Sequence, residues 1–248
     1  MKRIIFALFL PVLFFQALPS FAFGSKTEEA ASEYNSGNYR KAYELYYAEA
    51  LRSDGAKAWY NAGNAQYQLK NKSEAMFCYI KAFLLSPRDK YINANLSAVF
   101  SDTKQIFYHS GFGGMIERGW YYLSVREIYG TALFYFWLAC FSGCGLLLFR
   151  NPRAVSCIRE LLLCFIILFC AAFAWYGLRL GSGRYVSAGI VKAEVRTVIQ
   201  SGPGPGFAVI AELPDGMLVK ILKEDKEFYE ISASGIRGWI SKKNLLSL

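Results

Sequence analysis

Few side chains in this sequence are of the types that carry acid–base, nucleophilic or metal chemistry. His109 is the single histidine among 248 residues. One histidine excludes metal sites built on several imidazoles and leaves little basis for a Cys–His pair or a Ser–His–Asp triad. The acidic residues are scattered at positions typical of solvated surfaces, and no segment of catalytic-domain size remains for them. We therefore predict that the protein is not an enzyme and holds neither a metal nor a cofactor.

Cysteine chemistry is not indicated either. Cys78 stands alone in a polar segment, whereas the other five cysteines fall within one apolar stretch and its loop. A lone cysteine in an exported domain cannot form an internal bridge, and cysteines in membrane segments usually serve as small hydrophobic residues. We predict neither a disulfide framework nor a redox function. The five cysteines of the apolar stretch are Cys140, Cys144, Cys157, Cys164 and Cys170.

Composition favours a membrane over nucleic acid as the main partner. The chain is 54% hydrophobic and 19% charged, and the charged share is below the roughly 25% usual for soluble domains. The formal charge of +9 is compatible with a polyanion, but the aromatic fraction of 17% and long uncharged runs are typical of membrane proteins. We therefore predict contact with membrane lipid and no binding of nucleic acid.

The N-terminus has the pattern of a secretory signal peptide. Lys2 and Arg3 precede an apolar run at 4–18, and the small residues Ser20 and Ala22 occupy the −3 and −1 positions of a cleavage site. The alternative is an uncleaved membrane anchor, for which the run is short. The prediction is a signal peptide at residues 1–22.

Two uncharged runs predict a membrane hairpin. Residues 128–149 form a helix of about 33 Å and residues 161–178 one of about 27 Å at 1.5 Å per residue, enough to cross a hydrocarbon core. A buried core helix is the alternative for each run, and two runs so close together disfavour it. Ser124 and Glu127 form a capping box before the first run, and the aromatic residues 120–122 suit the membrane interface.

The loop at 150–160 determines the predicted orientation. Arg150, Arg153 and Arg159 form a basic cluster that the positive-inside rule assigns to the cytoplasm. Both ends of the hairpin then face outward, and export by the signal peptide leads independently to the same orientation. We predict a bacterial cytoplasmic (inner) membrane protein whose two flanking domains are extracytoplasmic, in the periplasm.

An internal repeat precedes the hairpin. Asn61 and Asn95 begin similar dipeptides 34 residues apart, which is the period of the tetratricopeptide helix–turn–helix. Residues 58–87 resemble one complete tetratricopeptide repeat, 34–46 the second half of another, and 91–99 the first helix of a third. Two to three such units are near the minimum that can bury the apolar stripe of each helix. The residues that match the repeat pattern are Trp59, Gly63, Ala75, Tyr79, Ala82 and Pro87.

The C-terminal segment changes to short β-type stretches separated by turn signals such as SGPGPG at 201–206. About sixty residues of this pattern predict a small β-barrel. The ending GIRGWISKKNLLSL, with Gly238, Trp239 and Ile240, resembles bacterial SH3-type domains, whose last strands carry a Gly–Trp–aliphatic step. Phe228 stands where many such domains carry a tryptophan in the preceding strand.

The predicted fold class is a multidomain membrane protein with α-helical tetratricopeptide repeats, a two-helix transmembrane hairpin and a C-terminal small all-β SH3-like barrel. The predicted boundaries are a signal peptide at 1–22, a repeat domain at 23–110, an interfacial connector at 111–127, transmembrane helices at 128–149 and 161–179, a cytoplasmic loop at 150–160, a linker at 180–186 and an SH3-type domain at 187–248.

This order of parts resembles the BatE-like family of the Bacteroides aerotolerance operon. The most specific stretches are AWYNAGNAQYQ, NANLSAV and VRTVIQSGPGPGFAVIAELPDGMLVKIL with GIRGWI. The resemblance implies a non-enzymatic inner-membrane protein that works beside membrane proteins with von Willebrand factor A domains and a MoxR-type ATPase, in tolerance of envelope stress.

In the resembled repeat, the first helix of each pair lines a concave peptide-binding face. Asparagine suits such a groove because its amide both donates and accepts hydrogen bonds; the alternative is that these amides only bond neighbouring helices. The charged clamp that some tetratricopeptide domains use for terminal carboxylates is not matched. The predicted groove residues are Tyr60, Asn61, Asn64, Tyr67 and Asn95.

The SH3-type domain offers a second candidate surface at Tyr229 and Trp239, which could contact a peptide or cell-wall peptidoglycan. The alternative is that Trp239 belongs to the core of a small domain. The function that fits best is a membrane-anchored adaptor that presents both modules to protein partners outside the membrane and assembles an envelope complex. The alternative is a cell-wall-binding sensor or an accessory subunit of an envelope hydrolase.

Overall fold

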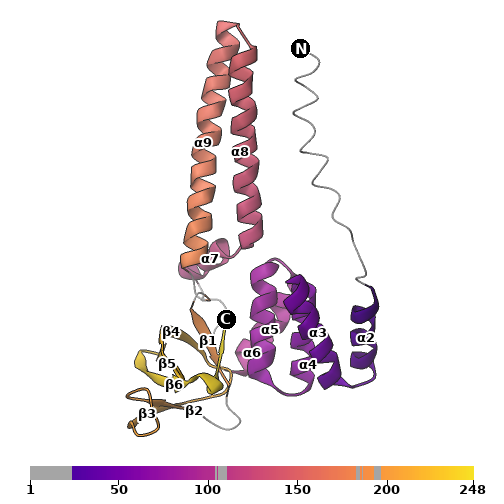
Figure 1. The fold of residues 1–248 in the computed structure, drawn as a ribbon, viewed down its shortest axis with the longest axis vertical. Coiled ribbons are helices and arrows are strands. Elements are labelled where there is room, and N and C mark those ends of the chain that lie inside the picture. The colour runs from indigo at the N-terminus through magenta and orange to yellow at the C-terminus, as the bar shows by residue number, and fades with distance from the viewer. Residues whose placement is uncertain (1–23, 104, 106–110, 183–184, 186, 193–196) are drawn as a thin grey trace.

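The computed structural model describes residues 24–103, 105, 111–182, 185, 187–192 and 197–248. The predicted signal peptide and His109 lie outside these residues. Helices occupy the first three quarters of the described chain and strands the last quarter (Figure 1). The helices are α2 (Gly24–Asn35), α3 (Tyr39–Ser53), α4 (Ala56–Gln68), α5 (Lys72–Leu85), α6 (Lys90–Asp102), α7 (Gly111–Trp120), α8 (Val125–Leu148) and α9 (Pro152–Gly181).

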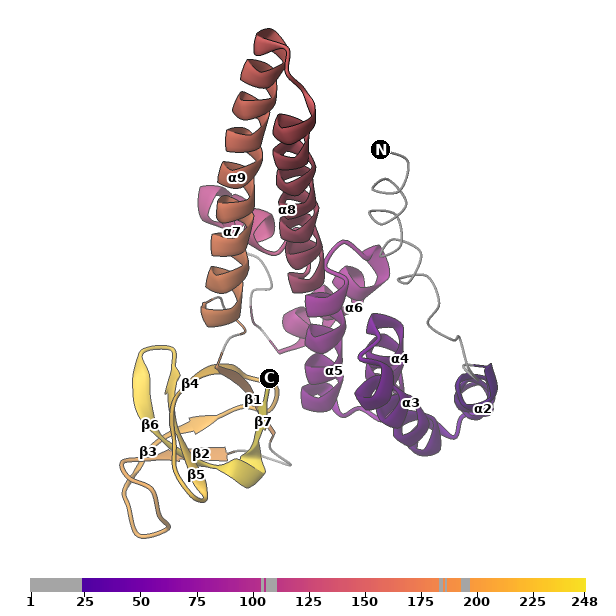
Figure 2. The same cartoon turned by 45° about the horizontal axis from the view of Figure 1, so that its top comes forward.

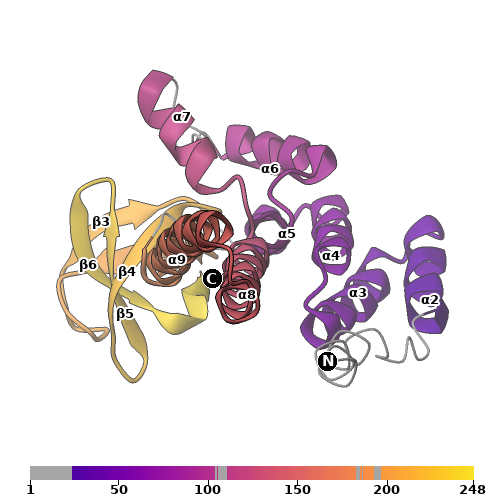
Figure 3. The same ribbon diagram turned by 90° about the horizontal axis from the view of Figure 1, so that it is seen from above.

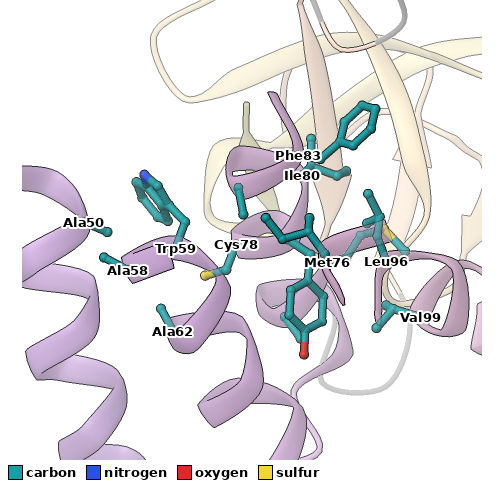
Figure 4. Close-up of a cluster of buried hydrophobic side chains, with 14 of the residues drawn as sticks. Ala50, Ala58, Trp59, Ala62, Met76, Cys78, Ile80, Phe83, Leu96 and Val99 are labelled. Carbon is teal, nitrogen blue, oxygen red and sulfur yellow. The ribbon is translucent and has the colours of Figure 1, made fainter. Parts of the chain in front are cut away.

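Helices α2 to α6 form the repeat domain, with α2/α3 and α4/α5 as helix pairs and α6 as the first helix of a third unit. Small buried residues let neighbouring helices approach closely, and larger side chains of α5 and α6 fill the space between the pairs (Figure 4). Gly63 shows why one position must be small: a Cβ there would lie 2.6 Å from the Tyr79 ring. The predicted repeats are therefore present.

Helices α8 and α9 pack side by side as a long hairpin that projects from the rest of the molecule (Figures 1 and 2). Each is long and apolar enough to cross a membrane, and only 6% of the most apolar window of each is buried inside the protein. A core helix of a soluble domain would be mostly buried. The predicted capping box is present: Ser124 Oγ accepts from the Glu127 amide, and Glu127 Oε2 accepts from the Ser124 amide at 2.9 Å.

The tip of the hairpin is shorter than the segment 150–160 that the charges indicated. Helix α9 begins at Pro152, because the Asn151 side chain accepts from the Arg153 amide at 3.0 Å and proline suits the first turn of a helix. Only 149–151 connect the two helices, and 152–160 are the first turns of α9.

The C-terminal domain is a seven-stranded antiparallel sheet with the order β3-β2-β6-β5-β4-β1-β7. Its core face carries Ile199, Ile231 and Ile240, all fully buried. The predicted all-β SH3-like fold is correct, but the sheet does not close into a barrel, since β3 and β7 are its two ends. The strands are β1 (Ala188–Val191), β2 (Thr197–Gln200), β3 (Val209–Leu213), β4 (Leu218–Glu224), β5 (Phe228–Ala233), β6 (Ile236–Ser241) and β7 (Leu245–Ser247), with the 3₁₀ helix η2 (Lys242–Asn244) before β7.

Three buried aromatic rings join the parts of the molecule, and we call them the aromatic junction. Phe83 belongs to α5, Tyr121 to the turn before α8, and Tyr185 to the connection between α9 and β1. Their ring centroids lie 5.3 to 6.1 Å apart. From above, the repeat helices and the sheet flank the hairpin on opposite sides (Figure 3). The junction therefore holds both domains against the same end of the hairpin.

Polar contacts add to this junction. The Gln105 side chain donates to the Gly216 carbonyl at 2.8 Å and accepts from the Leu218 amide at 2.9 Å. Its amide group therefore bonds to the backbone before and at the start of β4 in the way that a backbone peptide group of a neighbouring strand would. Lys192 Nζ lies 2.7 Å from Glu74 Oε1. Although burial raises the pKa of Glu74, the bonds from Lys192 and Ser73 outweigh it and the net pKa is lowered.

We expect Gln105→Ala to loosen the sheet from the repeat domain. The substitution leaves the Leu218 amide and the Gly216 carbonyl without their partner, which costs about 1–3 kcal/mol for buried groups. Hydrogen exchange at Leu218 should accelerate. Gln105→Glu separates the two bonds, since it keeps the acceptor for Leu218 but places a carboxylate oxygen against the Gly216 carbonyl; protection of Leu218 should fall between that of Gln105→Ala and that of the unchanged protein. Unchanged exchange in Gln105→Ala would show that this amide does not hold the domains together.

Candidate peptide-binding pocket

A pocket of about 380 Å³ opens on the face of the repeat domain that is formed by the first helix of each unit. Helices α2, α4 and α6 supply most of its wall, and one residue of α5 reaches it from behind. The repeat pattern predicted a groove on this face, which the first helices form. The lining residues are Tyr34, Tyr60, Asn64, Tyr67, Gln68, Tyr79, Asn95 and Ala98.

A hydrogen-bond network organises the floor of the pocket. Tyr79 Oη donates to Asn64 Oδ1 at 2.8 Å, and Asn95 Nδ2 donates to the same oxygen at 2.9 Å. Asn95 Nδ2 also lies 3.2 Å from Tyr60 Oη. Burial raises the pKa of Tyr79, which keeps its hydroxyl protonated as a donor. The network therefore fixes two amides from different repeats at one point.

Part of each amide is left for a ligand. Within the described residues, neither Asn64 Nδ2 nor Asn95 Oδ1 takes part in a hydrogen bond. One donor and one acceptor are the complements of the carbonyl and N–H of a peptide backbone. The lining carries no charged side chain, and an ion pair of Lys72 with Asp102, at 3.4 Å, lies beside the rim residue Tyr67.

The pocket includes four of the five residues predicted for the groove. Tyr60, Asn64 and Asn95 share the network, and Tyr67 stands at the rim with 39% of its surface exposed. Asn61 is on the same helix but does not line the pocket. The pattern did not identify Tyr34, Gln68, Tyr79 and Ala98 as groove residues.

The two residues predicted on the SH3-type surface do not form one site. Along β5, Tyr229 shares the core face with Ile231 and packs against the core, and Lys242 Nζ lies 5.0 Å from its ring. Along β6, Trp239 lies between the inward-facing Gly238 and Ile240, so it is directed to the opposite face. Trp239 is partly exposed and outside the core cluster.

Outside the pocket, we looked among the described residues for a metal site and for paired cysteines. No group of three or more His, Cys, Asp or Glu residues among them lies close enough to hold a metal ion. All six cysteines are free thiols; Cys78 is fully buried and its pKa is raised by burial, whereas the five cysteines of the hairpin are exposed.

Two family models match the chain. Residues 56–89 match the tetratricopeptide repeat, a segment that contains α4, α5 and five of the pocket residues, and residues 193–245 match the bacterial SH3 domain. No curated protein sequence matches the chain. Both matched modules are binding modules rather than catalytic ones, which agrees with a pocket built from neutral amides and tyrosines.

We expect Tyr79→Phe to destabilise the repeat domain by about 1 kcal/mol, the usual net value of a buried hydrogen bond. The substitution removes the donor to Asn64 and leaves the ring in place. Tyr34→Phe is the control, because no hydrogen bond in the described structure uses its hydroxyl. Chemical denaturation of the two variants measures the difference. Equal stability of both variants would contradict the structural role of the network.

Proposed function

We propose that this protein is a membrane-anchored adaptor whose repeat pocket binds an extended, uncharged segment of a partner protein. The observation that supports this most directly is the pair of fixed amides, Asn64 and Asn95, at the floor of the pocket. They offer a donor and an acceptor for a peptide backbone. The neutral lining disfavours a C-terminal carboxylate, which would need a basic partner.

The anchor in this proposal is the α8–α9 hairpin. Its outward-facing apolar side chains, such as Ile167 at 67% exposure, would be costly in water and are suited to lipid. Arg150 and Arg153 are exposed at the tip, which supports a cytoplasmic tip under the positive-inside rule. The repeat domain and the sheet would then both lie on the outer, periplasmic side of a bacterial inner membrane.

The second module gives the adaptor a second contact. Trp239, which is partly exposed on the face of the sheet opposite the core, is our candidate contact for a partner protein or for peptidoglycan. The resemblance to the BatE-like family favours a protein partner, specifically membrane proteins with von Willebrand factor A domains, in an envelope complex for aerotolerance or stress. A cell-wall-binding sensor or an accessory subunit of an envelope hydrolase is the second candidate, and the SH3 match favours it.

We expect Asn64→Ala with Asn95→Ala to lower partner capture several-fold, because each lost hydrogen bond costs on the order of 1 kcal/mol. The measurement is crosslinking followed by affinity purification from detergent-solubilised membranes. Asn61→Ala is the matched control, since Asn61 is the same residue type on the same helix but outside the pocket. Equal capture by the double variant and the control would exclude the pocket as the binding site.

The proposed orientation is tested by thiol labelling in intact spheroplasts. Cys157 is exposed near the hairpin tip, whereas Cys78 is buried and cannot report on the outer side. Leu51, which is 64% exposed on α3, is a better outer position. A membrane-impermeant maleimide should label Leu51→Cys and spare Cys157 when each is the only exposed cysteine. Labelling of Cys157 alone would reverse the topology.

A further inference from the structure

We propose that α7 is an interfacial helix that lies in the headgroup region of the membrane leaflet next to the repeat domain and the sheet. The inference rests on the proposed membrane crossing of α8 and α9. It assigns a lipid surface, rather than a protein partner, as the occupant of the exposed face of α7.

The first observation is that the exposed face of α7 carries two large apolar side chains, with the exposed Arg118 beside them. Met115 is 63% exposed and Ile116 is 56% exposed, and the two are adjacent in a short helix between Gly114 and Glu117. In a helix that faces water the exposed positions would be polar and the apolar ones would face the protein. Here large apolar side chains point away from the protein, which is the pattern of a helix that lies on a membrane.

The second observation is the position of α7 at the base of the hairpin. Only 121–124 separate its last residue from the start of α8. In the ribbon view α7 lies at the lower end of α8 and α9, and from above it projects sideways from them (Figures 1 and 3). A helix that runs across the hairpin at its end lies in the membrane plane when the hairpin crosses the membrane. α7 therefore lies at the level of the end of the hairpin, where the hairpin would leave the bilayer.

The third observation is that aromatic and arginine side chains gather at the end of the hairpin next to α7. The Arg179 guanidinium is buried against the rings of Tyr121, at 4.4 Å, and Trp120, at 6.0 Å. Tyr122 is 60% exposed, with Arg88 5.3 Å from its ring centroid. Aromatic rings and arginines gather where hydrocarbon meets headgroups. Arg179 and Tyr121 are packed inside the protein, whereas Tyr122 is exposed and Trp120 is partly exposed, so these two accessible rings mark the depth of the interface at the end of α7.

Depth-dependent fluorescence quenching tests the proposal in the full chain, reconstituted in phosphatidylcholine and phosphatidylglycerol bilayers. The five exposed cysteines are replaced by serine, and buried Cys78 is kept. A fluorophore is then attached at Met115→Cys or Ile116→Cys. Val209→Cys is the matched water-exposed control, being an apolar β3 residue that is 57% exposed. A variant that keeps Cys170 reports on the middle of the hairpin.

Probes on α7 should be quenched by lipids brominated near the headgroup end of the acyl chain, and less by lipids brominated near the methyl end. The Val209 probe should show no quenching, and the Cys170 probe should be quenched most by deep bromines. Unquenched α7 probes beside a quenched Cys170 probe would overturn the interfacial helix and leave the hairpin intact, which would point to a protein as the occupant. An unquenched Cys170 probe would overturn the membrane crossing and the inference with it.

Discussion

The packing of three aromatic rings at one point determines how the parts of this molecule are arranged. Phe83, Tyr121 and Tyr185 come from the repeat domain, the start of the hairpin and the entry to the sheet, and each is buried against the other two. Aromatic pairs of this kind contribute about 0.5–1.5 kcal/mol each beyond the area that they bury. Removing any ring would open a cavity shared by three structural elements.

The junction changes what kind of adaptor the protein can be. Two modules on flexible linkers gain avidity through effective concentration. Here, however, Ile190 of β1 lies in one buried cluster with the repeat core, Leu246 and Leu248 pack against that cluster, and Gln105 bonds to the sheet. The same end of the hairpin carries ion pairs of Arg88 with Glu127 and of Arg126 with Asp54, the latter at 2.8 Å. The pocket and the sheet therefore face a partner in one geometry relative to the hairpin.

Local sequence patterns predicted the elements better than their contacts. The 34-residue period located α4, α5 and α6, and the Ser124 capping box marked the start of α8. The start of α9 was misjudged because the charges of 150–160 suggested a loop, although Asn151 and Pro152 form a helix start signal. The hydrogen bond that the Leu218 amide donates to the Gln105 side chain spans 113 positions, and no local pattern indicates such a pair.

In the pocket, too, local patterns predicted positions on a helix but not contacts between helices. Repeat geometry identified Tyr60, Asn64, Tyr67 and Asn95, since the inward positions of a first helix follow from its period. Tyr79 was assigned to the core pattern, and its ring does lie there, but its hydroxyl reaches Asn64 in the pocket. The open sheet was also not predicted, because the places of β3 and β7 at its two ends depend on strand pairing that no local pattern indicates.

The most direct test of the account is the distance between the two domains in a bilayer. Spin labels at Leu51→Cys on α3 and Val209→Cys on β3, both at exposed positions, can be measured by double electron–electron resonance in lipid nanodiscs after the other exposed cysteines are replaced. The aromatic junction predicts one narrow distance distribution. A broad distribution, as for two domains on flexible linkers, would contradict the single fixed arrangement on which the proposed adaptor depends.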